Sequence, residues 1–117
     1  MHDLVWTEQA AQTYNQLRDQ ANAARKKRRS GSSGRKKSTK AEGLFKQVAK
    51  CADLLSTNPR HPGLQTHPYS SIPHPYDKNQ KTFEAYVQQH TPGAYRLFWC
   101  YGPGKNQITI IAITPHP

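Results

Sequence analysis

Hydrophobic residues recur with a helical period in the first half of this chain and alternate with polar ones near its end. In the first half, four lie at spacings of four, three and four residues, which is one face of an α-helix: Ala10, Tyr14, Leu17 and Ala21. Thr7 is suited to cap this helix, and Glu8 would face the positive end of the helix dipole. We therefore expect a helix that begins after Thr7 and fades near Ala24, preceded by a short strand at residues 3–6.

A second helix is predicted between Thr39 and Asn58. Its hydrophobic residues repeat the spacing of four, three and four: Leu44, Val48, Cys51 and Leu55. Thr39 and Glu42 have the Thr-x-x-Glu pattern of a capping box, and the Asn58–Pro59 step ends the helix. Two amphipathic helices in succession predict a helical hairpin.

Proline interrupts residues 59–82, which carry five prolines and predict a loop-rich stretch. This stretch holds at most one short strand, near residues 64–67. Pro68 would end that strand or confine it to the edge of a sheet, because proline cannot donate a ladder hydrogen bond.

Residues 83–117 predict three antiparallel strands. A turn around Pro92–Gly93 would pair His90 with Arg96 and would sort the side chains by parity. One face would be apolar and would receive the helices: Phe83, Ala85, Val87, Tyr95, Leu97, Trp99 and Tyr101. The other face would be more polar and open to a ligand: Glu84, Tyr86, Gln88, His90, Arg96, Phe98 and Cys100. By the same parity, the last strand would add four residues to the Arg96 face: Ile108, Ile110, Ala112 and His116.

Together these elements predict an α+β fold, in which an N-terminal strand and a helical hairpin pack on a small antiparallel β-sheet. The length of 117 residues is typical of one domain. We therefore expect a single domain over residues 1–117, with a flexible basic loop between the helices at residues 25–40.

That loop carries most of the excess charge of the chain. The net charge is +10, and nine of the 17 Lys and Arg residues lie in residues 25–40, which contain no acidic and no apolar residue. Charge repulsion together with Gly and Ser favours flexibility, although the GSSG run at residues 31–34 is also typical of an engineered linker. The segment is either a solvated linker or a cationic arm that holds an RNA backbone. The candidate RNA-binding residues are Arg25, Lys26, Lys27, Arg28, Arg29, Arg35, Lys36, Lys37 and Lys40.

Cys51 and Cys100 lie in apolar patterns, which favours buried free thiols over a disulfide. The first residues have neither a basic n-region nor a long apolar run, and no stretch approaches the length of a membrane span. We therefore expect a cytoplasmic protein without a membrane partner. The histidines and cysteines lack metal-ligand spacing, so we expect no metal site and no cofactor.

Arg96 is the strongest candidate functional residue. It is a lone charge in the apolar and aromatic segment AYRLFWCYG at residues 94–102, where a charge must be paired or used. Glu84 is its simplest ion-pair partner. His116 follows near the end of the last strand, and an arginine and a histidine on one small sheet indicate phosphate chemistry.

The order of these elements resembles that of the RelE/ParE superfamily of bacterial type II toxins. The resemblance covers nearly the whole chain except residues 24–40, and it is carried by residues 4–6, 44–55, 58–69, 83–86, 94–102 and 108–117. It implies a small α+β toxin domain that a cognate antitoxin neutralises. Many members of the superfamily cut mRNA, usually on the ribosome and without a metal, whereas ParE-like members inhibit gyrase.

The resemblance also implies roles for single residues. In the nuclease members an arginine on the third strand stabilises the scissile phosphate, which Arg96 matches, and a residue near the C-terminus acts as an acid, which His116 matches. The base of the family varies, and the corresponding region here offers His61 and His67. We therefore hypothesise a ribonuclease in which His67 or Glu84 takes the 2′-OH proton and His116 protonates the leaving 5′-oxygen. Alternatively, Glu84 orients Arg96.

Two other functions stay open at this point. The chain would be a ParE-like toxin that blocks a protein target such as gyrase without cutting RNA, or a nucleic-acid-binding module without toxicity. The Arg96 and His116 combination favours the nuclease, because a binder has no use for an acid that titrates near neutrality. The expected partners are an antitoxin, mRNA and, for a ribosome-associated nuclease, the ribosome.

Overall fold

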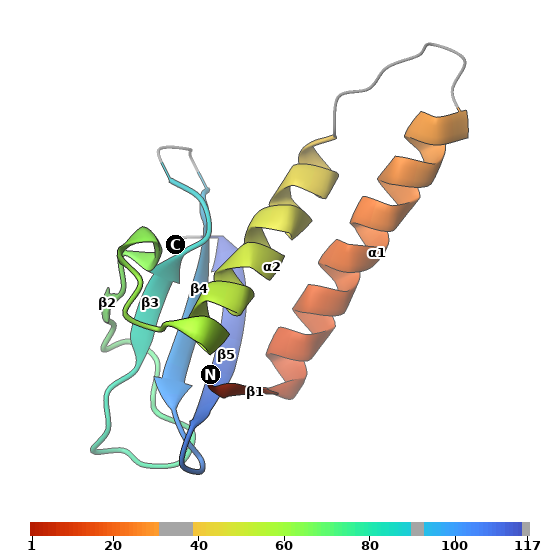
Figure 1. The fold of residues 1–117 in the computed structure, drawn as a ribbon. Coiled ribbons are helices and arrows are strands. Elements are labelled where there is room, and N and C mark those ends of the chain that lie inside the picture. The colour runs from red at the N-terminus through yellow and green to blue at the C-terminus, as the bar shows by residue number, and fades with distance from the viewer. Residues whose placement is uncertain (31–38, 90–92, 116–117) are drawn as a thin grey trace.

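Two long helices lie against one face of a five-stranded sheet in the computed structural model of the chain (Figure 1). The structure describes residues 1–30, 39–89 and 93–115, and of residues 28–30 the backbone alone. In chain order the elements are β1 (Asp3–Trp6), α1 (Glu8–Ser30), α2 (Lys40–Thr57), the 3₁₀ turn η1 (Pro62–Leu64), β2 (His67–Pro68), β3 (Phe83–Tyr86), β4 (Tyr95–Tyr101) and β5 (Gln107–Pro115). The predicted α+β class and the order of strand, two helices and sheet are confirmed.

Both helices begin at the predicted caps. At the start of α1, the N–H of Ala10 donates to Thr7 Oγ1 at 3.1 Å. At the start of α2, the N–H of Glu42 donates to Thr39 Oγ1 at 3.2 Å, and the N–H of Thr39 donates to Glu42 Oε1 at 3.3 Å, which completes the capping box. These bonds satisfy N–H groups that the first turn of a helix leaves without partners, so the two threonines fix where the helices begin.

Helix α1 extends further than the hydrophobic pattern predicted. It continues through Ser30, so residues 25–30 are helical rather than part of a flexible loop, and α2 already begins at Lys40. Lys and Arg are good helix formers, and the first strong helix breaker after Ala24 is Gly31, so local propensity outweighs the charge repulsion. The predicted flexibility of residues 31–38 lies outside the described residues. Within the described part of the chain, no helix is both long and apolar enough to cross a membrane.

The N-terminal strand joins the sheet, which is mixed and has the order β1-β5-β4-β3-β2. Strand β1 pairs with β5 in parallel, whereas the three other strand pairs are antiparallel, as predicted for the C-terminal strands. Parallel neighbours require a long crossover, and both helices and three strands lie between β1 and β5 along the chain. At the opposite edge, β2 has two residues and ends in Pro68, in agreement with the proline pattern.

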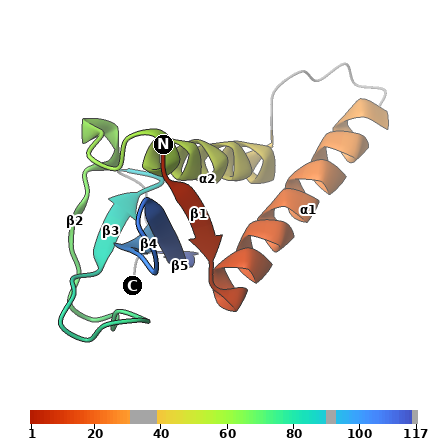
Figure 2. The same ribbon diagram turned by 60° about the horizontal axis from the view of Figure 1, so that its bottom comes forward.

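The core lies between α2 and the sheet. Side chains at odd positions of β3 and β4 face the helices, as their parity predicted, and Ala85, Leu97 and Trp99 are almost fully buried there. They belong to one hydrophobic cluster with Val48 and Leu55 of α2, both with no exposed surface. This burial of apolar surface holds α2 across one side of the sheet (Figure 2).

A loop of residues 69–82 covers part of the other side of the sheet (Figure 2). The ring of Tyr69 lies 4.8 Å from the ring of Phe98, and the hydroxyl of Tyr76 forms a hydrogen bond of 2.9 Å with Thr109 Oγ1. We expected this whole face to be open to a ligand, and that expectation is wrong at the Phe98 end. Aromatic side chains in the loop cover the apolar residues that parity brings to this face, because leaving them in water would be unfavourable.

The pairing of β3 with β4 differs by four residues from the predicted pairing. Tyr86 lies opposite Arg96, in the place predicted for His90, and His90 itself lies outside the described residues. The ladder ends early because the N–H groups of the two residues after Tyr86 both donate to the carbonyl of Tyr95, at 3.2 Å each. Since the two registers share the same parity, the predicted assignment of side chains to faces is unaffected on these strands.

A β-bulge in β5 changes which residues accompany the arginine. Trp99 pairs with Ile110 and Phe98 pairs with Ala112, so β5 has one extra residue, Ile111, at this point. Beyond the bulge, Ala112 lies on the arginine face, as predicted. Before the bulge, Ile108 and Ile110 were predicted to lie on the arginine face, and this prediction is wrong. Both are fully buried in the core.

Thr7 connects this bulge to the start of α1. Its N–H donates to the carbonyl of Ile110 at 3.1 Å, and its hydroxyl donates to the carbonyl of Ile111 at 2.6 Å. The same hydroxyl caps α1, so one side chain fixes both the helix start and the irregular step of the strand. A contact over 104 residues of sequence separation could not be read from local pattern.

Candidate catalytic site

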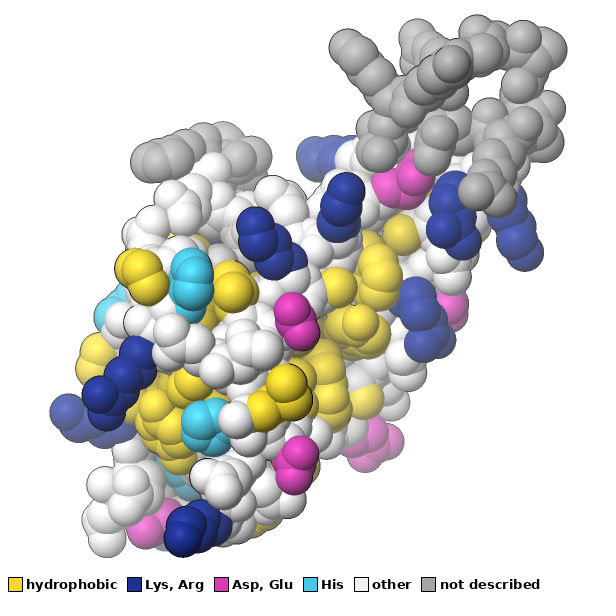
Figure 3. All heavy atoms as spheres, in the orientation of Figure 1, with side chains coloured by type: hydrophobic (Ala, Val, Ile, Leu, Met, Phe, Trp, Pro, Cys, Tyr) yellow, Lys and Arg dark blue, Asp and Glu magenta, His cyan; other side chains and the backbone are white. Residues whose placement is uncertain are grey.

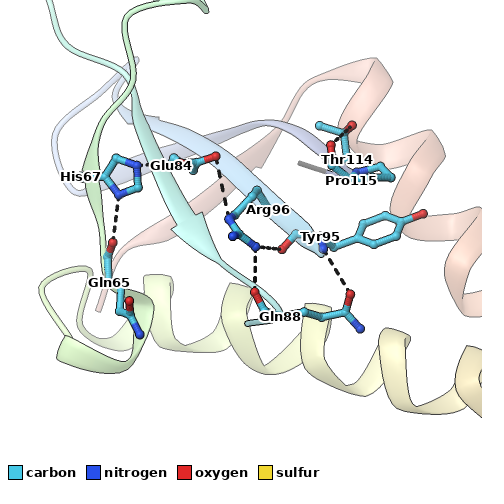
Figure 4. Close-up of polar contacts among 8 residues, drawn as sticks. All are labelled: Gln65, His67, Glu84, Gln88, Tyr95, Arg96, Thr114 and Pro115. Carbon is cyan, nitrogen blue, oxygen red and sulfur yellow. Dashed lines mark hydrogen bonds and ion pairs between the residues drawn. The ribbon is translucent and has the colours of Figure 1, made fainter. Parts of the chain in front are cut away.

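Three neighbouring strands bring His67, Glu84 and Arg96 together on the sheet face that turns away from the helices (Figure 4). His67 on the edge strand β2 lies directly opposite Glu84 on β3. Arg96 on β4 lies diagonally from Glu84, since its direct partner is Tyr86. Because successive side chains of a strand alternate between faces, this pairing is enough to place the three groups on one side.

The guanidinium of Arg96 is held on several sides. Its Nη1 donates to the carbonyl of Gln88 at 2.7 Å and to the carbonyl of Tyr95 at 3.2 Å. Its Cζ lies 3.9 Å from the centre of the Tyr86 ring, within the range of a cation–π contact. These contacts fix the plane and position of the charge, so the side chain is preorganised rather than free to rotate (Figure 4).

Arg96 still has a buried donor available. Its Nε is buried and has no hydrogen-bond partner among the described residues, and the nearest carboxylate oxygen, Glu84 Oε2, is 4.0 Å away. A buried N–H without an acceptor is unfavourable, and an anionic oxygen would satisfy it. Only 8% of Arg96 is exposed, however, so a phosphate reaches it only when a covering group such as Tyr86 moves.

His67 and Glu84 share a proton at this site. His67 Nε2 lies 2.6 Å from Glu84 Oε1, and His67 Nδ1 lies 3.2 Å from the carbonyl of Gln65. A carbonyl can only accept, so Nδ1 carries a hydrogen and donates to Gln65. The remaining proton lies between Nε2 and the carboxyl group. The side chain of His67 is 44% exposed, whereas that of Glu84 is 3% exposed, so the histidine is the solvent-facing member of the pair.

Glu84 lies between the two basic groups, as the hypothesis of an Arg96 partner required. Its contact with His67 is shorter than its contact with Arg96, at 2.6 Å against 4.0 Å. A carboxylate that is 2% exposed needs charged or hydrogen-bonding neighbours to offset its lost hydration. The sequence could not reveal the His67 contact, because nothing local indicates which residue of the proline-rich stretch pairs with β3.

The predicted acid, His116, lies outside the described residues. The bulge makes Thr114 the direct partner of Arg96 on β5, so His116 follows that partner by two positions in the sequence. Its catalytic role therefore stays a prediction.

The basic residues of the helical hairpin are not brought to this cluster. Arg25, Lys26 and Lys27 are exposed on the last turns of α1, and Lys40 is exposed at the first turn of α2. These ends of the helices project beyond the sheet, on the side away from β2 (Figures 1 and 3). The remaining five candidates fall where no side chain is described: Arg28, Arg29, Arg35, Lys36 and Lys37.

Two further residues near the site have structural or supporting roles. His61 caps the 3₁₀ turn η1, with its Nδ1 accepting from the N–H of Gly63 at 2.9 Å, so it is a turn residue rather than a base. Tyr86 covers the arginine, and its ring also lies 5.8 Å from that of His67. Strand parity placed Tyr86 on the same face as Arg96, and the correct strand register would have identified this contact.

The described residues of the site include neither a metal-binding group nor a thiol nucleophile. In the described residues, no group of three or more His, Cys, Asp or Glu side chains is arranged to hold a metal ion. Cys51 and Cys100 are free and buried, as predicted. Burial raises the pKa of the Cys51 thiol to about 12 and that of the Cys100 thiol to about 11, so both remain protonated and unreactive near neutral pH.

No protein-family model matches the sequence, and no curated protein matches it either. Solved structures do match its fold over nearly the whole chain. The YoeB/ParE toxin from Agrobacterium tumefaciens superposes with a TM-score of 0.58 at 11% identity, over 98% of this chain and 99% of that one.

Two other solved structures give similar values. The YoeB dimer from Staphylococcus aureus matches with a TM-score of 0.56 at 12% identity, over 99% of this chain and 98% of that one. A chain of the archaeal RelE–RelB complex from Pyrococcus horikoshii matches with a TM-score of 0.56 at 11% identity, over 97% of this chain and 93% of that one. At sequence identities this low, a structural match shows a shared fold but not a shared activity. The chain therefore has the same fold as these YoeB/ParE, YoeB and RelE–RelB structures.

Proposed function

We propose that this chain is the toxin of a type II toxin–antitoxin system and acts in the cytoplasm as a metal-independent endoribonuclease on mRNA at the ribosome. The observation that carries the proposal is the placement of Arg96 beside the His67 and Glu84 pair, whose Nε2 and Oε1 atoms lie 2.6 Å apart, on one sheet face. The fold supports the same class of protein, and the RelE–RelB complex among the similar structures supports an antitoxin partner.

The proposed reaction is an attack of the RNA 2′-oxygen on the adjacent phosphorus. His67 takes the 2′-OH proton, because its side chain is exposed whereas that of Glu84 is buried. For this step the proton between His67 and Glu84 must reside on Glu84, and the His67 ring must turn so that the lone pair of Nε2 faces the 2′-OH instead of the carboxyl group. The buried carboxyl group thus serves to position the imidazole and to hold a proton.

Charge then builds on the phosphorane oxygens, and the bond from phosphorus to the 5′-oxygen breaks. Arg96 stabilises that charge, with its Nε and the outer guanidinium nitrogens as donors. The leaving 5′-oxygen takes a proton from His116, so the products are a 2′,3′-cyclic phosphate and a 5′-hydroxyl. Removal of a single electrostatic stabiliser of this kind costs on the order of 100- to 1000-fold in rate.

A second candidate function has one observation in its favour. Arg96 is largely buried and donates to two backbone carbonyls, which is also what a structural arginine does. In that case the chain would act like the ParE-type toxins, by blocking a protein target such as gyrase. The two candidates differ in whether RNA is cut.

Incubation of the purified protein with RNA alone and with translating ribosomes, both in EDTA, tests the proposal. We expect cleavage in at least the ribosome reaction, with 2′,3′-cyclic phosphate ends on the upstream fragments. Asp53→Asn, which neutralises an exposed acid on α2, is a matched control and should cut at the wild-type rate. Intact RNA in both reactions, together with inhibition of gyrase supercoiling, would refute the nuclease function and favour the second candidate function.

A further inference from the structure

A groove opens on the helix side of the sheet, beyond the end of α2. One hollow of about 490 Å³ lies between the segment after α2 and the ends of β3 and β4. A second hollow of about 550 Å³ adjoins it near the N-terminus, and Arg60 and Tyr101 line both. We call the two together the Tyr101 groove. It lies on the opposite face of the sheet from Arg96, so it is separate from the candidate catalytic site.

Aromatic rings form the floor of the Tyr101 groove. Phe83 and Trp99 stack with ring centres 4.8 Å apart and planes 27° from parallel. Tyr101 stands edge-on to both, at 6.0 Å from Phe83 and 5.0 Å from Trp99. Its parity would place Tyr101 in the core, but α2 ends at Thr57 and leaves it 45% exposed. The ring of Tyr101 is therefore presented to solvent, with the other two rings packed against it.

The charge around the groove is positive. Arg60 is exposed and lines both hollows, and His61 and His2 line one each. Among the described residues that line the two hollows there is no Asp or Glu. Figure 3, which views the molecule from this side, shows hydrophobic, histidine and Lys or Arg side chains close together over the sheet. A ligand with a flat apolar group next to a negative charge matches this combination.

One wall of the groove leads toward the catalytic cluster. Gln65 and Thr66 line its wall, and the carbonyl of Gln65 accepts the hydrogen bond from His67. His67 directly follows Thr66 and is the first residue of β2, the two-residue edge strand of the sheet. A strand of RNA held at His67 and Arg96 can thus pass over this edge and continue into the groove.

We propose that the Tyr101 groove binds one unpaired base of the RNA strand, stacked on Tyr101, with Arg60 on the neighbouring phosphate. Stacking suits any base, because every base has a π-face, and an arginine presents paired donors to a phosphate. The ligand class rests on the proposed function. The groove would fix how the RNA lies relative to His67 without contributing to the chemistry.

Fluorescence anisotropy with a labelled single-stranded RNA of about ten nucleotides tests the proposal. All variants are made in an Arg96→Ala background, so that slow cleavage does not disturb the equilibrium. Tyr101→Ala should weaken binding by roughly 5- to 150-fold, the loss of one base stack. Tyr101→Phe keeps the ring and should bind like its parent. Arg60→Ala, a second variant on an exposed side chain, should weaken binding and reduce its salt dependence.

An abasic scan of the same RNA locates the stacked base. Removing one particular base should weaken binding to the parent protein, and should have no further effect once Tyr101 is alanine. Equal binding by the parent and Tyr101→Ala would overturn the proposal that the groove binds a base. Equal losses of affinity at every abasic position would overturn it as well. Saturable binding of a protein partner in place of RNA, weakened by Tyr101→Ala, would overturn the assigned ligand.

The result of this binding experiment does not depend on whether the protein cleaves RNA. Suppose that the ribosome reaction leaves RNA intact but that the abasic scan finds one base whose effect on binding depends on Tyr101. The proposal for the groove is then supported and the nuclease proposal fails. If Arg96→Ala abolishes cleavage while Tyr101→Ala binds normally, the nuclease stands and the groove fails. Thermal unfolding of each variant shows whether a loss of binding reflects a loss of folding.

Discussion

Replacing Glu84 by glutamine would remove a negative charge from the catalytic cluster with little change of shape. At the 4.0 Å between Glu84 Oε2 and Arg96 Nε, and with an effective dielectric constant of about 20, the lost attraction is about 4 kcal/mol. Breaking a buried ion pair by removing one partner costs about 3–5 kcal/mol by experiment, because the other charge stays behind. We therefore expect Glu84→Gln to lower the free energy of unfolding at pH 7 by about 3–4 kcal/mol.

Urea and thermal unfolding measure this loss, which corresponds to a fall of roughly 10–20 °C in Tm. Asp53→Asn is the matched control, because Asp53 is exposed and its loss should change stability by less than about 0.5 kcal/mol. The double variant Glu84→Gln/Arg96→Met removes both charges and should be more stable than the two single losses predict. A coupling energy within about 0.5 kcal/mol of zero would refute the argument that the two charges stabilise each other.

Other predictions concern activity, salt and pH. Arg96→Ala should reduce RNA cleavage by roughly 100- to 1000-fold in a folded protein, and Arg96→Lys should not restore it fully; wild-type cleavage by either would contradict the assignment. His116→Gln should slow single-turnover cleavage by roughly 100- to 10,000-fold and remove the alkaline limb of the rate profile, whereas an unchanged rate after deletion of residues 116–117 would leave another group as the acid. Replacing the basic residues 25–29 by glutamine should weaken RNA binding for all sequences alike and lower the slope of log K against log salt by about 0.7 per charge removed; an unchanged slope would make that segment a linker. Cys51 and Cys100 have raised pKa values in the folded state, so their contribution to stability is present below pH 9.0 and is lost as pH rises toward about 11 to 12; a double Cys→Ala variant with the same alkaline decline would attribute that decline to other groups.

Parity explains why much of the sheet could be predicted. Side chains alternate strictly along a strand, so the hydrophobic pattern assigned Leu97 to the helix side and Arg96 to the other side even though the predicted register was four residues off. The helix caps were equally local, because Thr39 and Glu42 bond within one turn. Fold class followed from these local patterns taken in chain order.

The errors arose where distant parts of the chain decide the structure. The bulge at Ile111 depends on Thr7, and the position of His67 depends on which residue of a proline-rich stretch pairs with Glu84. Neither contact leaves a periodic signal in the sequence. The end of α1 was misjudged for another reason, since Arg25 to Ser30 carry no hydrophobic stripe and yet favour a helix by propensity.

The extra residue at Ile111 also affects how this chain compares with other sequences. Before it, β5 directs its even-numbered side chains into the core, and after it the even-numbered Ala112 and Thr114 pair with residues on the opposite face. A protein of the same fold with an unbroken strand here needs a one-residue gap in any alignment with this chain. Without that gap, every position that follows compares an interior residue with an outward-facing one. Two proteins can then share a C-terminal strand in space and still show unrelated residues there, column by column.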